Sequence, residues 1–203
     1  DLLRSDADDV WYVDPLDGTT NYLHAYPFFA VSIAHGKNRQ LVLGVVYDTC
    51  RDELFYAEQG TGAFVRRGMA NGESTRLHVS QTAVFSDALL STGFPYDRAV
   101  TTDNNSAQFA AVCRRAQGVR RCGSAALDLA YVAAGRLDGH WERGLGPWDA
   151  AAGALLVREA GGRVTGRRGE AWSPAEQRPT PVPAHREIAA PDERGLVVPR
   201  EMR

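Results

Sequence analysis

The stretch DPLDGTT, Asp14 to Thr20, follows directly on the short apolar run Val10 to Val13 and decides how the chain is interpreted. The run is rich in residues that favour β structure, and it predicts a buried strand. Pro15 cannot donate a ladder hydrogen bond and biases Asp14 toward extended geometry, so we expect the strand to end there. The residues from Asp17 to Asn21 predict a turn and the start of a helix.

The same stretch combines features that suit a metal ion and a phosphate group. Asp14 and Asp17 are carboxylates three residues apart, and hard divalent cations such as Mg²⁺ prefer several oxygen ligands that also supply charge. A bridging aspartate would hold two ions close together, as two-metal phosphatases require. Backbone N–H groups of Gly18, Thr19 and Thr20 would point out of a helix N-terminus toward an anion. A surface turn with an Asx cap explains an isolated Asp-Gly-Thr, but not this combination.

The spacing of the two carboxylates argues against another class of phosphatase. Haloacid dehalogenase-type enzymes use two aspartates two residues apart at a strand end, and the first is a covalent nucleophile. In a strand, a spacing of two keeps both side chains on one face, whereas the spacing of three between Asp14 and Asp17 reverses the face. This favours metal-activated water as the nucleophile over an aspartyl-phosphate intermediate.

Two later segments supply further candidates. Pro147 to Gly153 predicts a helix with Asp149 in its first turn, where the helix dipole alone favours a carboxylate. Asp149 is a candidate metal ligand because the first motif lacks enough ligands of its own. Ser124 is a good N-cap, and with the small Ala125 after it this helix start suits a substrate hydroxyl or an anion. Glu142 either hydrogen-bonds a polyol or is an ordinary solvated carboxylate.

The remaining pattern predicts an α+β domain over 1–165 and a different tail over 166–203. Strands are expected at 28–35, 41–47, 53–57, 62–65, 88–92, 137–141 and 163–165, the first four forming an antiparallel meander. Helices are expected at 106–116, 125–134 and 148–160. The tail is rich in Pro, Arg and Glu, and only 187–190 and 195–198 look able to pack.

Bulk properties exclude several classes of protein. The chain has 203 residues, 44% of them hydrophobic and 24% charged, and its net charge of −2 gives no electrostatic footprint for nucleic acid. No apolar run is long enough for a membrane span. Three scattered cysteines predict a reduced, cytoplasmic protein without a disulfide framework. The five dispersed histidines are expected at the surface or in loops rather than at a metal.

Taken together, these motifs resemble the inositol monophosphatase family, within the lithium-sensitive, Mg²⁺-dependent sugar phosphatase superfamily. The matching segments cover about residues 8 to 165 and occur in the family's order: Asp14 to Asn21, Phe29 to Ile33, Gly44 to Asp48, Gly123 to Asp128, and Trp148 to Gly153. The resemblance implies a layered αβαβα sandwich and in-line attack of water on a phosphomonoester. It also implies two or three Mg²⁺ ions and a homodimer.

The resemblance assigns the metal ligands by motif. Asp14 would bridge two ions, and the Leu16 carbonyl would bind one of them. Asp17 and Asp149 would complete the second ion's site.

It also assigns the substrate contacts. Gly18 and Thr19 would bind phosphate, and the Thr19 hydroxyl would orient the attacking water, which makes Asp14, Asp17 and Thr19 the implied catalytic residues. Ser124, Ala125 and Glu142, together with Asp17 and Asp149, would contact the sugar or inositol ring.

The sequence departs from the family's pattern at both ends. Family members carry a metal-binding Glu some way before the first Asp motif, and nothing among the 13 residues before Asp14 matches it. We therefore expect a chain truncated ahead of that Glu, without the family's N-terminal helices and first strands, and weakly active or inactive as it stands. The tail after Thr165 only faintly matches the family's final strand and helix, and is expected to be divergent, frameshifted or poorly ordered.

Several functions stay open at this stage. The leading substrate is inositol monophosphate or a similar small sugar or polyol phosphate. Fructose 1,6-bisphosphate, histidinol phosphate and 3′-phosphoadenosine 5′-phosphate are alternatives within the superfamily. A non-catalytic protein-interaction role is the alternative from another class, because some bacterial relatives are associated with the transcription machinery. Such a role gives no physical reason for three convergent carboxylates.

Overall fold

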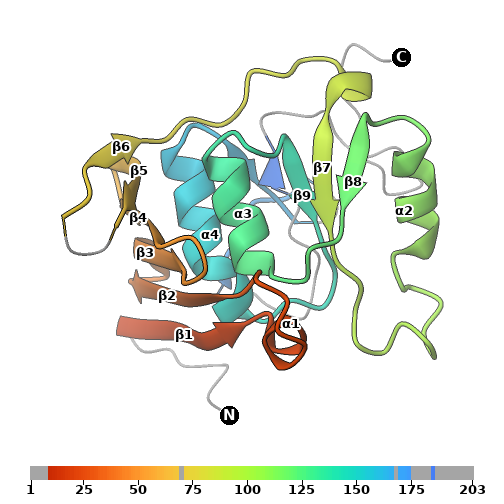
Figure 1. Cartoon of the computed structure of the whole chain (residues 1–203), viewed down its shortest axis with the longest axis horizontal. Coiled ribbons are helices and arrows are strands. Elements are labelled where there is room, and N and C mark those ends of the chain that lie inside the picture. Colours follow the sequence, from red (N-terminus) through yellow and green to blue (C-terminus); the bar gives the residue numbers. More distant parts are fainter. Residues whose placement is uncertain (1–8, 69–70, 167–168, 175–183, 186–203) are drawn as a thin grey trace.

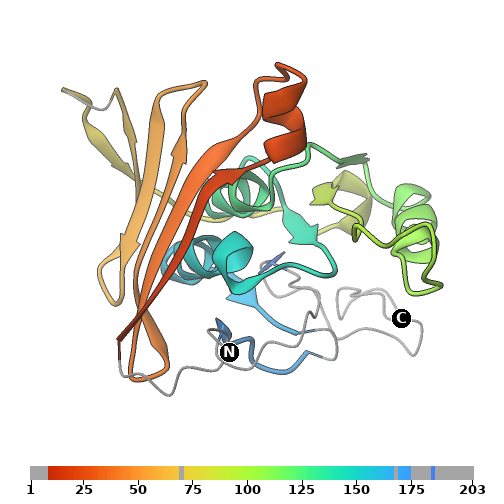
Figure 2. The same cartoon turned by 90° about the horizontal axis from the view of Figure 1, so that it is seen from below.

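A computed structural model describes residues 9–68, 71–166, 169–174 and 184–185. Two β-sheets enclose a pair of helices, α3 (Ala125–Ala133) and α4 (Pro147–Glu159), and a further helix, α2 (Ser106–Cys113), lies beyond the second sheet (Figures 1 and 2). This layering confirms the predicted α+β sandwich. Among the described residues, none of the helices is long and apolar enough to cross a membrane.

The first sheet is a six-stranded antiparallel meander in which each strand pairs with the next along the chain. Its strands are β1 (Asp9–Asp17), β2 (Ala30–Lys37), β3 (Gln40–Asp48), β4 (Glu53–Glu58), β5 (Gly62–Arg67) and β6 (Ser74–Arg76). The four predicted meander strands correspond to β2 to β5, which confirms them. The short strand β6 was not predicted.

The prediction of a buried strand that ends at Asp14 was wrong in both respects. Strand β1 lies at the edge of the sheet, and Trp11 and Val13 are 59% and 50% exposed. The strand continues through Pro15 to Asp17, and its register with β2 shifts between Asp14 and Asp17. Pro15 is tolerated there because an edge strand with an irregular register does not need its missing N–H.

The second sheet has the order β10-β11-β9-β7-β8. Its strands are β7 (Leu89–Thr92), β8 (Gly118–Arg120), β9 (Gly139–Trp141), β10 (Arg163–Val164) and β11 (Ala184–His185). Strand β7 runs parallel to both of its neighbours. Sequence predicted β7, β9 and β10, but not β8, nor the strand β11 within the expected tail. The predicted packing segments 187–190 and 195–198 lie outside the described residues.

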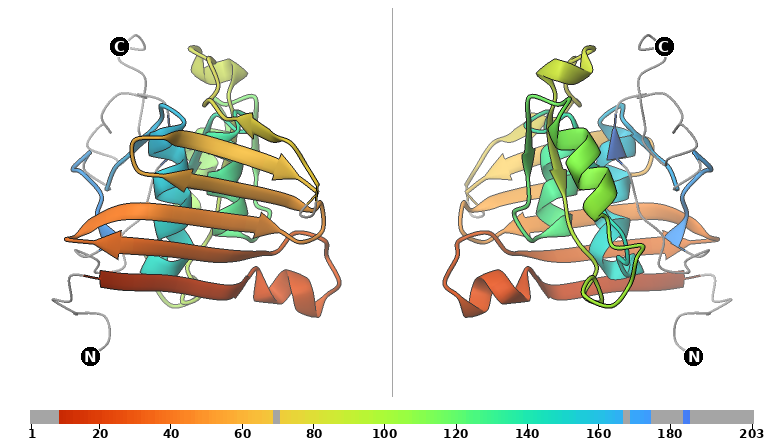
Figure 3. Two further views of the ribbon diagram at one scale, coloured as in Figure 1. Left: turned by 90° about the vertical axis from the view of Figure 1, so that its left-hand side faces the viewer. Right: turned by 90° about the vertical axis from the view of Figure 1, so that its right-hand side faces the viewer.

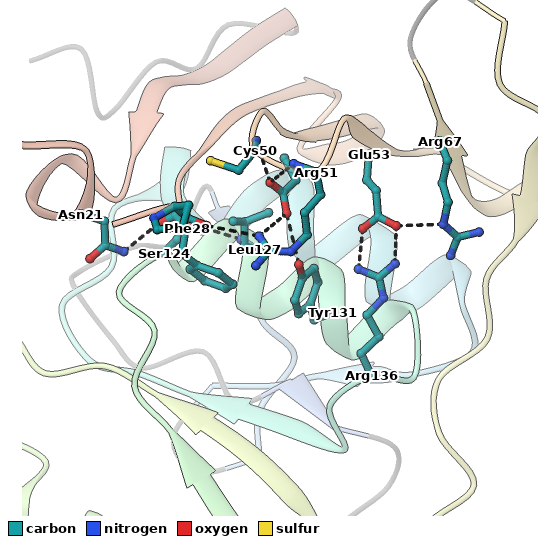
Figure 4. A network of polar contacts seen from close by, with 12 residues as sticks. Asn21, Phe28, Cys50, Arg51, Glu53, Arg67, Ser124, Leu127, Tyr131 and Arg136 are labelled. Atoms are coloured by element: carbon teal, nitrogen blue, oxygen red, sulfur yellow. Dashed lines mark hydrogen bonds and ion pairs between the residues drawn. The ribbon is translucent and has the colours of Figure 1, made fainter. Parts of the chain in front are cut away.

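Two shorter helical segments complete the fold. Helix α1 (Thr19–Leu23) follows β1 as predicted, and a 3₁₀ turn, η1 (Phe85–Asp87), precedes β7. Helix α1 is tied to the segment before α3, because the Asn21 amide donates hydrogen bonds to the carbonyls of Phe28 (2.7 Å) and Cys122 (2.8 Å). Figure 4 shows Asn21 beside Phe28 and Ser124.

Small residues bring α4 very close to its neighbours. A Cβ on Gly44 of β3 would lie 2.8 Å from the Ala152 carbonyl oxygen, and one on Gly153 would overlap the Leu129 side chain of α3. Ala151 and Ala152 have no exposed surface. Helix α4 is therefore packed tightly between β3 and α3, where glycines allow the close approach. This packing fixes the position of its N-terminus.

A partly buried ion pair joins the C-terminal end of α3 to the first sheet. Arg136 donates to both carboxylate oxygens of Glu53, at 2.5 and 2.6 Å, and Arg67 donates to the same carboxylate at 2.9 Å (Figure 4). Arg136 holds the pKa of Glu53 below its usual range even though burial opposes this. Because both partners of the bidentate pair are oriented, the contact fixes the angle between α3 and the sheet.

The other face of the six-stranded sheet is covered by none of the described helices or strands. The left view of Figure 3 looks directly at this face, with the helices behind it. Alternation along the strands places apolar side chains there that are exposed or only partly buried. They are Trp11, Val13, Val31, Ile33, Leu43, Val45, Tyr47, Leu54, Tyr56 and Phe64. We call this surface the outer sheet face.

Candidate metal centre

Three predicted metal ligands lie close together in the fold. Asp14, Asp17 and Asp149 each offer a carboxylate oxygen, and these three atoms lie within 4.8 Å of one another. Asp14 and Asp17 come from the irregular end of β1, and Asp149 comes from the first turn of α4. The register shift explains how carboxylates three residues apart reach the same point, which regular pleating would prevent.

The turn after Asp14 is fixed by local hydrogen bonds. The Leu16 N–H donates to Asp14 Oδ1 at 2.9 Å, and the Thr19 hydroxyl donates to the Leu16 carbonyl at 2.9 Å. The predicted carbonyl ligand and the predicted water-orienting hydroxyl are thus neighbours. Gly18 precedes α1 with φ of 89°, a backbone conformation that favours glycine.

Asp17 is buried and caps α3. Its Oδ2 accepts hydrogen bonds from the Ser124 hydroxyl at 2.5 Å and from the Ala126 N–H at 2.8 Å. Ser124 also accepts from Leu127 N–H, which confirms it as the N-cap. Two predicted site residues, Asp17 and Ser124, are therefore in direct contact. Ala125 is buried beside them.

Asp149 is held in the same manner by its own helix. Its Oδ2 accepts a hydrogen bond from the Gly146 N–H at 2.6 Å at the start of α4. Burial is the largest influence on this carboxyl and, with the charges of Asp17 and Asp14, raises its pKa to about 7. Asp149 therefore occupies a first-turn position that the helix dipole alone would favour, and it also belongs to the acidic cluster.

The electrostatics of the cluster fit a divalent cation. Burial raises the pKa of Asp17 to about 6, against the hydrogen bonds from Ser124 and Ala126, and the charges of Asp14 and Glu142 raise it further. Close carboxylates in a low-dielectric site resist ionisation together. A hard cation that prefers oxygen ligands would remove the repulsion between the carboxylates. The three carboxylates of the cluster therefore form a donor set that suits Mg²⁺.

A second group of buried polar residues adjoins the cluster. His140 and Asp128 are almost completely buried, and Glu142 is 16% exposed at its side chain. The expectation that the histidines lie at the surface or in loops was therefore wrong for His140, which is on β9. Asp128 and His140 were both missed as site residues. The sequence signal for Asp128 was a lone carboxylate within the apolar helix 125–134.

Comparison with known proteins points in one direction. A sequence profile described as "Inositol monophosphatase family" matches residues 3–198. An inositol-1-monophosphatase from Synechocystis is 51% identical over 155 residues, which is 76% of this chain and 52% of that protein. A protein named Nus factor SuhB from Pseudomonas aeruginosa is 50% identical, over 78% of this chain and 57% of its own length.

Solved structures agree with these relatives. An inositol monophosphatase from Anabaena superposes with a TM-score of 0.81 and 48% identity, and the match covers 90% of this chain and 68% of that one. An inositol monophosphatase from Thermotoga maritima has a TM-score of 0.76 at 36% identity. The chain spans little more than half the length of the curated relatives it matches.

Proposed function

The chain belongs to the inositol monophosphatase family, and from this premise we propose that it hydrolyses the phosphate monoester of a small polyol or sugar with the help of Mg²⁺. Inositol monophosphate is the first candidate substrate. The observation that carries the proposal is the convergence of Asp14, Asp17 and Asp149 within 4.8 Å. Two of these ligands are aimed by hydrogen bonds from helix N-termini.

Each ligand has a distinct supporting contact. Asp14 and Asp149 present carboxylates from opposite elements, β1 and α4, so the ion would be held between them. The Oδ2 atom of Asp17 accepts two hydrogen bonds at the N-terminus of α3, and we propose Oδ1 as its metal ligand. When bound, Mg²⁺ supplies positive charge that polarises phosphoryl oxygens and lowers the pKa of water.

The remaining proposed roles concern substrate and water. The Thr19 hydroxyl lies 2.9 Å from the Leu16 carbonyl, in a position to orient an attacking water. Gly18 and Thr19 stand at the start of α1, where free backbone N–H groups suit phosphate oxygens. Ser124 and Ala125, at the start of α3, and Glu142, just after β9, are proposed to contact the polyol.

The test is phosphate release from inositol 1-phosphate, with and without Mg²⁺ and Li⁺. The 203-residue chain should be compared with a version extended upstream in its gene, and each with Asp14→Asn. We expect the extended protein to show Mg²⁺-dependent turnover that Li⁺ inhibits and Asp14→Asn abolishes, and the 203-residue chain to show little or none. Fructose 1,6-bisphosphate, histidinol phosphate and 3′-phosphoadenosine 5′-phosphate should be assayed in parallel. An extended protein that is inert on all four phosphates would contradict the proposal.

A protein-interaction role is the second candidate, because relatives at 44% to 50% identity are named Nus factor SuhB. The Asp14→Asn variant separates the two roles. It should abolish phosphatase activity by removing a metal ligand, but it should leave partner binding unchanged if binding uses another surface. Partner binding that survives in this variant while the extended wild type releases no phosphate would favour the interaction role.

Two further expectations remain proposals. The cysteines Cys50, Cys113 and Cys122 are all unpaired, which supports a reducing compartment such as the cytoplasm. A homodimer is proposed from the family alone, and sedimentation velocity on the purified chain tests it.

A further inference from the structure

His140 lies between two carboxylates in the interior of the second sheet. Its Nδ1 atom is 2.9 Å from the Ser91 hydroxyl on β7 and 3.7 Å from Asp128 Oδ2 on α3. Its Nε2 atom is 3.5 Å from Glu142 Oε2, just after β9. The His140 side chain has no exposed surface, and the Asp128 side chain has only 2%. The imidazole therefore bridges a fully buried carboxylate and one at the border of the metal centre.

The charges around this imidazole favour its protonated form. Burial is the largest single influence and lowers the pKa of His140, but contact with Glu142 and the negative charges of Asp128, Glu142 and Asp17 together raise it above the usual value. These three groups come from α3, the end of β9 and the end of β1. For the carboxyl group of Asp128, burial has the opposite effect and raises the pKa to about 7, while the charge of His140 opposes that rise. A neutral ring would leave these carboxylates close together without a cation.

Glu142 is held on its other side by a glycine. A Cβ on Gly93 would overlap the Glu142 carboxylate, so the carboxylate rests directly against the Gly93 backbone. The negative charge of Glu142 also contributes, after burial and the charge of Asp14, to the raised pKa of Asp17. Glu142 is thus confined between Gly93 and His140 at the edge of the proposed substrate site.

We propose that protonated His140 is a positioning residue that holds Glu142 in place to bind a hydroxyl group of the polyol. This inference rests on the proposed function, since it concerns the polyol half of the proposed substrate. Loss of the proton removes the attraction to Glu142 and leaves the repulsion from Asp128 and Asp17. Recognition of the polyol should therefore weaken as pH rises through the titration of His140, while binding of the phosphate half does not depend on this ring.

The first test measures the ring itself and needs no activity. The chain, labelled with ¹⁵N at its histidines, is titrated by NMR between pH 5 and 9, and His140→Gln assigns the signals of the buried ring. We expect His140 to lose its proton at a pH above the ordinary histidine value of 6.5, and to do so at lower pH in Glu142→Gln and in Asp128→Asn. A ring that is neutral throughout, or one whose titration does not move in Glu142→Gln, overturns the proposal.

The second test separates the polyol from the phosphate. Calorimetry in Mg²⁺ compares the dissociation constants of inositol 1-phosphate and inorganic phosphate for wild type, His140→Gln, His140→Phe and the control His78→Gln. We expect the preference for inositol 1-phosphate to fall about tenfold in both His140 variants, the size of one charge-assisted hydrogen bond. Phosphate affinity and the control should be unchanged.

These experiments separate the positioning role of His140 from the proposed phosphatase function. An unchanged preference in a folded His140→Gln or His140→Phe chain overturns the positioning role, whatever the phosphatase does. If wild type binds neither ligand in Mg²⁺, even when it is extended upstream, the proposed function fails. The NMR titrations of Glu142→Gln and Asp128→Asn then still decide whether His140 holds Glu142.

Discussion

At the scale of single residues, Asp149 serves a helix and the metal cluster at once. One carboxylate oxygen accepts the Gly146 N–H, and the cluster lies within reach of the same side chain. Asn retains an acceptor for the helix but loses the charge. We expect Asp149→Asn to keep the fold, and to lose more Mg²⁺ affinity than the roughly 10–100-fold typical of supporting residues. Calorimetric Mg²⁺ titration measures this, with the exposed Asp97→Asn as the matched control.

The acidic residues also predict how stability depends on pH. The folded-state pKa values of Asp17 and Asp149, about 6 and about 7, lie above the ordinary Asp value of 3.8. A group whose pKa is raised by folding contributes its full stabilisation at pH values below its pKa in the unfolded chain. That contribution is lost as the pH rises through its pKa in the folded chain. His140 acts in the same direction. Glu53, whose pKa is lowered, has already made its contribution above its ordinary value of 4.5.

The melting temperature of the metal-free chain should therefore fall between pH 5.5 and 7.5. Saturating Mg²⁺ should raise it more at the upper pH than at the lower one, because the ion binds the ionised carboxylates. Thermal scans at fixed ionic strength provide the measurement, and Asp149→Asn should show a weaker dependence on pH. A melting temperature that rises over this interval would contradict the assignment of raised pKa values.

At the scale of elements, the close approach of β3 to α4 predicts how the site is positioned. A Cβ at Gly44 meets backbone atoms of Ala152, at 2.8 Å from the carbonyl oxygen and 3.1 Å from Cα, so α4 must move. We expect Gly44→Ala to cost about 1–3 kcal/mol of unfolding free energy. It should also weaken Mg²⁺ binding, because Asp149 moves with α4.

The matched control is Gly118→Ala on β8. A Cβ there meets only the ends of the Arg120 and Leu89 side chains, at 3.2 and 3.4 Å, and these can adjust. Urea unfolding and Mg²⁺ titration of both variants form the measurement. Equal effects of the two substitutions would mean that backbone contact with α4 does not position the site.

The comparison of predicted and observed elements shows which physical signals are visible in sequence. The meander and both central helices were predicted because their periodicity, turns and caps are local, as at Ser124 and Gly135. Strand β8 has three residues, and β11 has two, which is too short for a period to be recognised. The edge position of β1 was missed because an apolar run alone does not reveal how many neighbours a strand has.

The same distinction applies to the candidate site. Asp14, Asp17 and Asp149 were identified because each belongs to a motif with its own chemistry. The bulge that turns Asp14 and Asp17 toward one point was not predicted, because it depends on pairing with β2. His140 was missed because its partners, Ser91 and Asp128, are 49 and 12 positions away in sequence and meet it only in the fold.

At the scale of the whole molecule, the outer sheet face predicts behaviour in solution. A contiguous apolar surface of this kind binds hydrophobic dyes or other molecules. We expect the purified 203-residue chain to bind a dye such as anilinonaphthalene sulfonate while folded. Ile33 and Val45 are paired at the centre of this face, so the double variant Ile33→Thr, Val45→Thr should bind much less dye with little change in stability.

The control for this experiment lies on the opposite side of the same strand. Val46 has no exposed surface and faces the helices, so Val46→Thr buries a hydroxyl and should destabilise the fold. Fluorescence titration and urea unfolding distinguish the variants. If the double variant binds as much dye as wild type, the exposed apolar surface lies elsewhere.

The bond between Asp17 and Ser124 joins residues 107 positions apart in the sequence, and this separation has a kinetic consequence. The cluster cannot exist until the first sheet, α3 and α4 have docked, which places it among the contacts expected to form late in folding. Mg²⁺ should therefore slow the unfolding rate and leave the refolding rate almost unchanged. Stopped-flow measurements with and without Mg²⁺ would compare the two rates, and a change confined to the unfolding rate would place formation of the cluster in the last step of folding.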